Sequence, residues 1–232
     1  MYSCWTRTSI PVSFMAFQYP SVFFSSRQVG TEGPGSCLNT SPTLEQLIIC
    51  FDNYVVPPDF YYLPRYNDAQ PSTEERTAWK EMVASLLATD NNCSSIIIPI
   101  PLVDLYAVTT FTESSSSSNP YCVLFETTSK NGIYSKGWGL IVVPATRRAV
   151  SRFIHISAPH PLADSNTTQQ AAALFKSTGA KSLSIPGRIR MAFSEATDCI
   201  QSPSGTVYYK TDPAHDKVNK SSLALDYLSI AF

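Results

Sequence analysis

Two of the three histidines of this chain lie near acidic residues, in stretches that read as loops. His160 is followed four residues later by Asp164, and His215 comes three residues after Asp212. Imidazole nitrogens and carboxylate oxygens are common zinc ligands, and three protein ligands leave a fourth position for water in a catalytic site. We therefore predict that His160, Asp164 and His215 bind a catalytic zinc ion. Asp212 is predicted to orient one of the histidines.

Further charged residues are candidates for contacts with a substrate. Arg188 and Arg190 follow a strand-like run, and a guanidinium group matches the geometry of a carboxylate or a phosphate. We predict that both arginines bind an anionic group of the substrate. Glu126, at the end of the run 121–127, is the candidate general base. The remaining histidine, His155, lies inside a strand pattern and is interpreted as structural.

The elements that must position these residues form a strand–helix–strand unit over 152–186. Strand-like runs at 153–157 and 181–185 flank a helical pattern at 167–177, which is typical of a right-handed parallel crossover. A further strand is expected at 206–210. Ligands of open α/β sheets bind beyond the carboxyl ends of the strands, where the candidate residues follow. The sequence therefore predicts the site at this edge of the sheet.

Capping residues mark the two helices that the sequence predicts. Ser72 and Glu75 form the pattern of a capping box before the apolar stripe of a helix near 73–89. Thr167 and Gln170 form the same pattern at the second helix. Both helices are therefore expected to pack an apolar face against a sheet.

The predicted fold class is α/β, a single domain with a mixed, partly parallel sheet. Residues 1–71 are expected to form a loop-rich N-terminal segment, 72–216 the core domain, and 217–232 a C-terminal tail. Because the chain stops soon after His215, we expect a truncated or inactive relative of a longer enzyme. The earlier strands of the sheet are expected at 95–100, 105–111, 121–127 and 139–143.

Composition narrows the partners and the compartment. The 17 basic and 18 acidic residues give a net charge of −1 without blocks of like charge, which argues against nucleic-acid binding. No stretch is long and apolar enough to span a membrane. Six scattered cysteines without a C-x-x-C pair fit either disulfides in a secreted protein or buried thiols in a cytosolic one. We favour a secreted, disulfide-bonded glycoprotein, with N-x-S/T sequons at Asn39, Asn92, Asn166 and Asn219.

The stretch from Cys122 to His215 resembles a family of uncharacterised secreted fungal proteins. The order of a His-acid loop, a helix, a strand with arginine and a late histidine is also loosely similar to zinc carboxypeptidase-like exopeptidases. That resemblance implies two early metal ligands, an arginine that binds a carboxylate and a late histidine ligand. Those enzymes place two residues between His and Glu, whereas three separate His160 from Asp164 here. The residues that match the fungal family are Lys136 to Gly139, Pro159 to Pro161, Asp164, Thr167, Gly179, Ala180, Gly187, Arg188, Arg190 and Thr211 to His215.

These observations predict a secreted metal-assisted hydrolase that acts on a small amide, peptide or ester with an anionic group. The alternative is a non-catalytic secreted binding protein that uses the same strand edge as an anion-binding cleft. A metal-free phosphoester or glycoside hydrolase is a third interpretation, although no pair of acidic residues at a suitable spacing favours it. A serine hydrolase of the G-x-S-x-G type and a P-loop nucleotide enzyme are disfavoured, because neither motif occurs.

Overall fold

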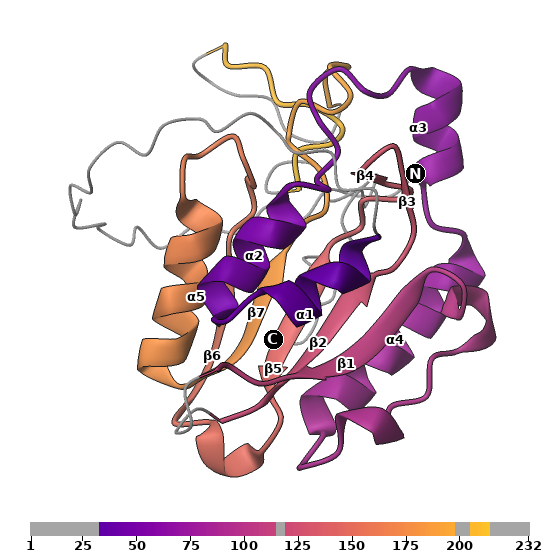
Figure 1. Cartoon of the computed structure of the whole chain (residues 1–232). Coiled ribbons are helices and arrows are strands. Elements are labelled where there is room, and N and C mark those ends of the chain that lie inside the picture. Colours follow the sequence, from indigo (N-terminus) through magenta and orange to yellow (C-terminus); the bar gives the residue numbers. More distant parts are fainter. Residues whose placement is uncertain (1–32, 115–118, 198–204, 214–232) are drawn as a thin grey trace.

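The computed structural model describes residues 33–114, 119–197 and 205–213, and its centre is a five-stranded sheet (Figure 1). The strand order is β1-β2-β5-β7-β6, and every pair is antiparallel except β6 with β7. This mixed sheet with helices confirms the predicted α/β class. The strands are β1 (Tyr106–Phe111), β2 (Tyr121–Glu126), β5 (Leu140–Pro144), β6 (Arg152–Ser157) and β7 (Ala180–Ile185), and a separate ribbon comprises β3 (Ser129–Lys130) and β4 (Ile133–Tyr134).

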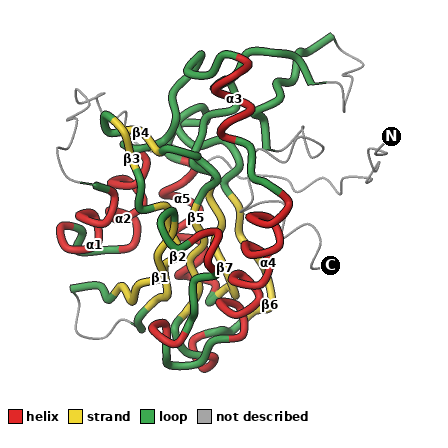
Figure 2. Tube along the Cα trace, turned by 90° about the vertical axis from the view of Figure 1, so that its right-hand side faces the viewer, coloured by secondary structure: helices red, strands yellow, loops and turns green. Residues whose placement is uncertain are grey.

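Helices cover both faces of the sheet. Figure 2 shows α4 on the opposite side of the sheet from α1 and α2. The α-helices are α1 (Cys37–Thr40), α2 (Leu44–Asp52), α3 (Leu63–Ala69), α4 (Thr73–Ala88) and α5 (Thr167–Thr178). Short 3-10 helices are η1 (Pro34–Ser36), η2 (Cys93–Ser95), η3 (Ile100–Leu102) and η4 (Arg147–Ala149).

Alternation along the strands divides the apolar side chains between two cores. On β2, Val123 and Phe125 pack in the core that includes α2 and α5, whereas Cys122 and Leu124 pack in the core that includes α4. Successive side chains of a strand point to opposite faces, so a strand buried on both sides is apolar throughout. This pattern explains why β2 reads as a continuous apolar run in the sequence.

The strand–helix–strand unit that leads to the site is confirmed. β6 and β7 pair in parallel with α5 between them, and Gly179 ends α5 in the left-handed region at φ 59°. The helix α4 begins with the predicted reciprocal capping box of Ser72 and Glu75. The predicted cap of α5 differs, since Asn166 is the N-cap residue and its side chain makes no capping hydrogen bond.

Three expectations about elements differ from the structure. The stretch 95–100 is not a strand but leads from η2 into η3, where Pro99 and Pro101 lack the N–H groups that a strand ladder needs. The stretch 206–210 contains an isolated bridge between Ala196 and Tyr209 instead of a strand. The described part of the N-terminal segment is helical, and α2 buries Leu44, Leu47, Ile48 and Phe51 in the core.

Four of the six cysteines form two disulfides. Cys37 pairs with Cys50 across α1 and α2, and Cys93 pairs with Cys122 to connect η2 with β2. Cys4 and Cys199 lie outside the described residues. Within the described ranges, no helix has the length and apolar character needed to cross a membrane.

Candidate functional site

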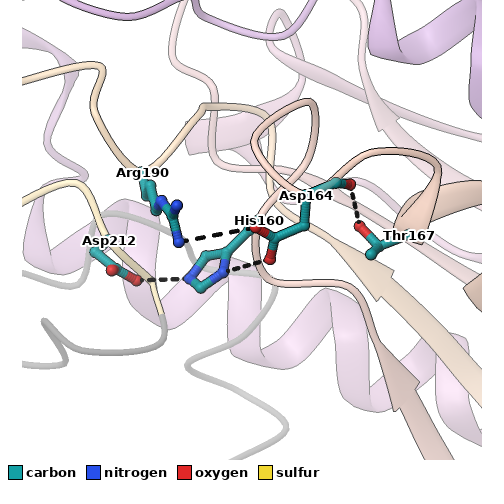
Figure 3. Close-up of polar contacts among 5 residues, drawn as sticks. All are labelled: His160, Asp164, Thr167, Arg190 and Asp212. Carbon is teal, nitrogen blue, oxygen red and sulfur yellow. Dashed lines mark hydrogen bonds and ion pairs between the residues drawn. The ribbon is translucent and has the colours of Figure 1, made fainter. Parts of the chain in front are cut away.

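His160 lies in the loop between β6 and α5, where its imidazole ring is placed between two carboxylates (Figure 3). Its Nδ1 lies 2.9 Å from Oδ2 of Asp164, and its Nε2 lies 3.0 Å from Oδ1 of Asp212. The two acids come from separate parts of the chain, because Asp212 follows the segment 205–211 that passes beyond the sheet. The structure therefore brings together three of the seven predicted site residues at the predicted strand edge, and Arg190 joins them as the fourth.

The loop that presents His160 and Asp164 is tightly turned. Leu162 has φ 62°, and the N–H of Ala163 donates to the carbonyl of Pro161 at 2.8 Å, which closes a γ-turn of the rare hand. The N–H of Asp164 then donates to the carbonyl of His160 at 3.2 Å. A leucine in the left-handed region is strained, and such strain persists only where surrounding contacts enforce it. The turn folds Asp164 back onto the imidazole.

The start of α5 fixes the same loop from its other end. The hydroxyl of Thr167 donates to the carbonyl of Asp164 at 2.8 Å, and the N–H of Thr167 donates to the same oxygen at 3.2 Å. Asn166 has φ 61°, a conformation that asparagine tolerates better than most residues. The helix therefore positions Asp164 through its backbone and leaves the carboxylate available to His160.

Asp212 is held by its neighbour Thr211, which is fully buried. The Thr211 hydroxyl donates to the carbonyl of Arg190 at 2.9 Å and accepts the N–H of Phe193 at 3.0 Å. These bonds attach the segment that contains Asp212 to the loop that follows β7. Thr211 belongs to the stretch that resembles the fungal family, but the sequence predicted no role for it, because a threonine beside a candidate acid gives no signal of the carbonyl that it will contact.

The two carboxylates differ in exposure. The side chain of Asp212 is 3% exposed and that of Asp164 is 43% exposed, while His160 is 12% exposed. Nδ1 of His160 therefore faces the solvent side of the cluster, and Nε2 faces its interior. Arg190 joins the solvent side, where its Nη1 lies 3.8 Å from Oδ1 of Asp164 and its side chain is 39% exposed.

The carboxylates also change the acid–base properties of the ring. The hydrogen bond to Asp212 is the largest influence and raises the pKa of His160 above its usual value, although partial burial opposes it. The charge of Asp212 and the contact with Asp164 raise this pKa further. The cluster thus favours an imidazolium ion, which holds one proton on each ring nitrogen until a competing cation displaces one.

Glu126 and Arg188 lie in a second, buried cluster around the turn that precedes β5. The Glu126 carboxylate accepts the N–H of Lys136 at 2.6 Å and the N–H of Gly137 at 2.8 Å. Arg188, which is fully buried, donates through Nε to the carbonyl of Gly137 at 3.0 Å and through Nη2 to that of Lys136. Burial raises the pKa of Glu126 to about 7, opposed by these backbone hydrogen bonds and by Arg188.

This buried placement bears on the two predicted roles. A general base and a substrate-binding cation both need access to a substrate, whereas both oxygens of Glu126 and two of the three guanidinium nitrogens of Arg188 bond to backbone groups of the 136–137 turn. The third nitrogen of Arg188, Nη1, is buried and has no hydrogen-bond partner among the described residues. Of the two predicted substrate-binding arginines, Arg190 presents its guanidinium to solvent and Arg188 does not. A sequence cannot distinguish them, since they are only two residues apart.

The third predicted zinc ligand, His215, lies outside the described residues. Among the described residues, no three His, Cys, Asp or Glu side chains converge on a point that could hold a metal ion. His160 and Asp164 do supply a nitrogen and an oxygen 2.9 Å apart. That separation is a hydrogen-bond distance and is shorter than the roughly 3.3 Å between two ligands of one tetrahedral zinc ion, so the two side chains would have to move slightly apart to hold a metal.

His155, interpreted as structural, contacts the neighbouring strand, with its Nδ1 2.5 Å from the hydroxyl of the buried Ser182. No protein-family model, curated protein or solved structure matches this chain.

Proposed function

We propose that this protein is a secreted metal-assisted hydrolase that acts on a small amide, peptide or ester bearing an anionic group. The observation that carries the proposal is the placement of His160 between two carboxylates of unlike exposure. A buried acid on one imidazole nitrogen and an accessible acid beside the other are typical of a histidine metal ligand with its orienting partner.

In this proposal His160 and Asp164 hold a zinc ion together with His215. Asp212 accepts the Nε2 proton of His160, so that Nδ1 is the nitrogen that binds the metal. When bound, zinc supplies Lewis-acid activation of water and of the scissile carbonyl. Binding requires the proton of Nδ1 to leave, since a metal ligand must have a free lone pair.

Arg190 supplies the contact with the anionic group of the substrate. Its guanidinium is half-exposed, and its ion-pair distance of 3.8 Å to Asp164 is long enough to leave N–H groups for a second carboxylate. Thr211 holds the backbone of this residue, which positions the arginine relative to Asp212. We assign Glu126 and Arg188 to the stability of the 136–137 turn and not to the reaction.

The secreted location is supported by the two disulfides, which persist in oxidising compartments. The sequons at Asn39, Asn92 and Asn166 are on exposed residues, as glycosylation requires. The resemblance to zinc carboxypeptidase-like exopeptidases points to the same reaction class, with a free carboxylate as the anionic group.

The test compares two sets of substrates. N-acetylated amino acids carry a free carboxylate, and the corresponding N-acetylated amino acid amides are neutral. We expect zinc-dependent turnover of the free acids that a chelator abolishes and that His160→Ala removes. Arg190→Gln should raise KM for the acids roughly tenfold or more with a smaller effect on kcat, because it removes a charge-assisted contact. Arg148→Gln, a control at an exposed arginine of η4, should leave both constants unchanged. Turnover that survives His160→Ala would contradict the proposal.

The alternative function is that of an anion-binding protein without catalysis. It is favoured by the exposed guanidinium of Arg190, which lies beside the carboxylates and the imidazole of the His160 site. It predicts no turnover of any panel member, together with saturable binding of the free acids that Arg190→Gln abolishes. Calorimetry on the same panel therefore separates the two functions.

A further inference from the structure

A cavity lies at the opposite end of the parallel strand pair from His160. This cavity of about 430 Å³ is bordered by the last turns of α4, the end of β5 and the amino ends of β6 and β7. The His160 site lies beyond the carboxyl ends of β6 and β7, so the two sites occupy different edges. The cavity volume is in the range of small-molecule sites.

The walls of this cavity are mainly apolar and accessible. Leu87 and Ala84 of α4, Val143 of β5, and Val150 and Phe153 beyond it all line the cavity. Phe153 is 81% exposed, and leaving so much apolar surface in contact with water is unfavourable. An apolar ligand in the cavity would cover this ring and bury the exposed methyl groups of the helix.

Two cations complete the lining. Arg147 and Lys181 border the cavity, and no Asp or Glu is among the described residues that line it. Arg147 uses Nη2 to donate to the carbonyl of Ala88 at the end of α4 at 3.0 Å, which leaves its other N–H groups for a ligand. The Lys181 Nζ lies 5.4 Å from the ring centroid of Phe153. Asp90, which does not line the cavity, accepts the backbone N–H of Arg147 at 3.0 Å.

We propose that this cavity binds an amphipathic monocarboxylate, with an aliphatic or aromatic body on the apolar walls and its carboxylate between Arg147 and Lys181. Charge complementarity selects an anion, since the described lining holds two cations and no acid. The apolar lining residues and the exposed Phe153 select a ligand with a hydrocarbon body over a small ion such as phosphate. This site is independent of the proposed hydrolytic one.

The test is calorimetric titration of the full chain with dodecanoate, with dodecan-1-ol as the neutral probe of equal length. We expect one dodecanoate per chain and weaker binding of the alcohol. The double variant Arg147→Gln with Lys181→Gln should weaken dodecanoate binding roughly tenfold or more, because it removes both charge-assisted contacts. Ala84→Trp, on the exposed side of α4, should fill the cavity and abolish binding of both probes.

Arg148→Gln is the matched control, since it removes an adjacent exposed cation that does not line the cavity. It should bind dodecanoate as the unaltered protein does. Circular dichroism of each variant verifies that it is folded. The proposal is overturned if dodecanoate shows no saturable binding, if the alcohol binds as tightly as the acid, or if folded Ala84→Trp binds dodecanoate normally.

Discussion

The imidazole of His160 makes different contacts at its two nitrogens. Nε2 meets a carboxylate that is almost fully buried, and Nδ1 meets one that is nearly half exposed. A buried acid orients the ring permanently, whereas an exposed acid is free to exchange the imidazole proton for a cation. This asymmetry leads us to assign metal binding to Nδ1 and Asp164, and orientation to Asp212.

At the same scale, Glu126→Gln tests whether Glu126 is structural. The amide nitrogen of glutamine would face N–H donors of Lys136 and Gly137, or its single oxygen would satisfy only one of them. We expect the free energy of unfolding to fall by roughly 1 to 3 kcal/mol, the cost of leaving a buried N–H without an acceptor. Urea denaturation measures it, with Glu81→Gln on the exposed side of α4 as the control.

A loss below about 0.5 kcal/mol would show that the turn does not depend on this carboxylate. The sequence placed Glu126 correctly at the end of a strand, but it could not reveal the partners of the side chain. Those partners follow ten residues later, in a turn whose N–H groups point inward only once the sheet has formed. His160 and Asp164 lie in one loop, and the sequence predicted them together as metal ligands because this loop and the stretch that contains His215 each follow a predicted strand. The hydrogen bond between their side chains was not predicted.

At the scale of elements, the contact between α2 and α5 contains a buried acid. Asp52 at the end of α2 accepts a hydrogen bond of 2.6 Å from the hydroxyl of Thr168 in α5. Burial raises the pKa of Asp52 to about 7, and the hydrogen bond only partly opposes the shift. The folded protein therefore binds a proton that the unfolded chain releases near pH 4.

This shift makes stability depend on pH in a defined direction. Between about pH 4 and pH 7 the folded state holds more protons than the unfolded state, so the Asp52 contribution to stability falls as pH rises. Asp52→Asn keeps an acceptor for Thr168 and removes the titration. The variant should gain roughly 1 to 4 kcal/mol relative to the unaltered protein between pH 4 and pH 8.

Urea denaturation at several pH values measures that difference, and Asp68→Asn at an exposed position of α3 is the control. A stability difference between Asp52→Asn and the unaltered protein that stays constant with pH would contradict the assignment. If Asp52→Asn were instead less stable than the unaltered protein at pH 8, the folded state would stabilise Asp52 as a carboxylate.

The close approach of two loops supports the buried cluster of Glu126 and Arg188. A Cβ added to Gly187 would lie 2.9 Å from the backbone carbons of Gly137, closer than real contacts allow. Gly187→Ala must therefore push the two loops apart, at a cost of roughly 1 to 3 kcal/mol. Gly35→Ala is the control, because nothing lies within 4 Å of its added Cβ. Equal thermal unfolding midpoints for the two variants would contradict this account of the packing.

The success of sequence reasoning also differed between elements. The helix α4 and the β6–α5–β7 unit were predicted because each combines a clear period with end signals such as Ser72 and Gly179. The stretch 95–100 has the apolar content of a strand, and the strand prediction relied on that content. Pro99 lacks the N–H group that a strand ladder needs. The helix α2 lies within the segment that was expected to be loop-rich, because its nine residues, six of them apolar, are too few to show a clear period.

At the scale of the whole molecule, the structure is a three-layer α/β fold with a disulfide in each core region. The Cys37–Cys50 bond ties the helices of one face, and Cys93–Cys122 ties the sheet to the segment after α4. The even number of cysteines predicted bridges without their pairing, which depends on the folded arrangement. The same fold places the proposed hydrolytic site and the proposed carboxylate cavity at opposite edges of one parallel strand pair.

The central claim is that His160 and Asp164 bind zinc, and elemental analysis of protein dialysed against zinc tests it most directly. We expect one zinc ion per chain in the unaltered protein, none in His160→Ala, and affinity weakened roughly 10- to 100-fold in Asp212→Asn, which perturbs only the orienting acid. Arg148→Gln should retain the metal. Zinc that is absent from the unaltered protein, or that His160→Ala retains in full, would contradict the account.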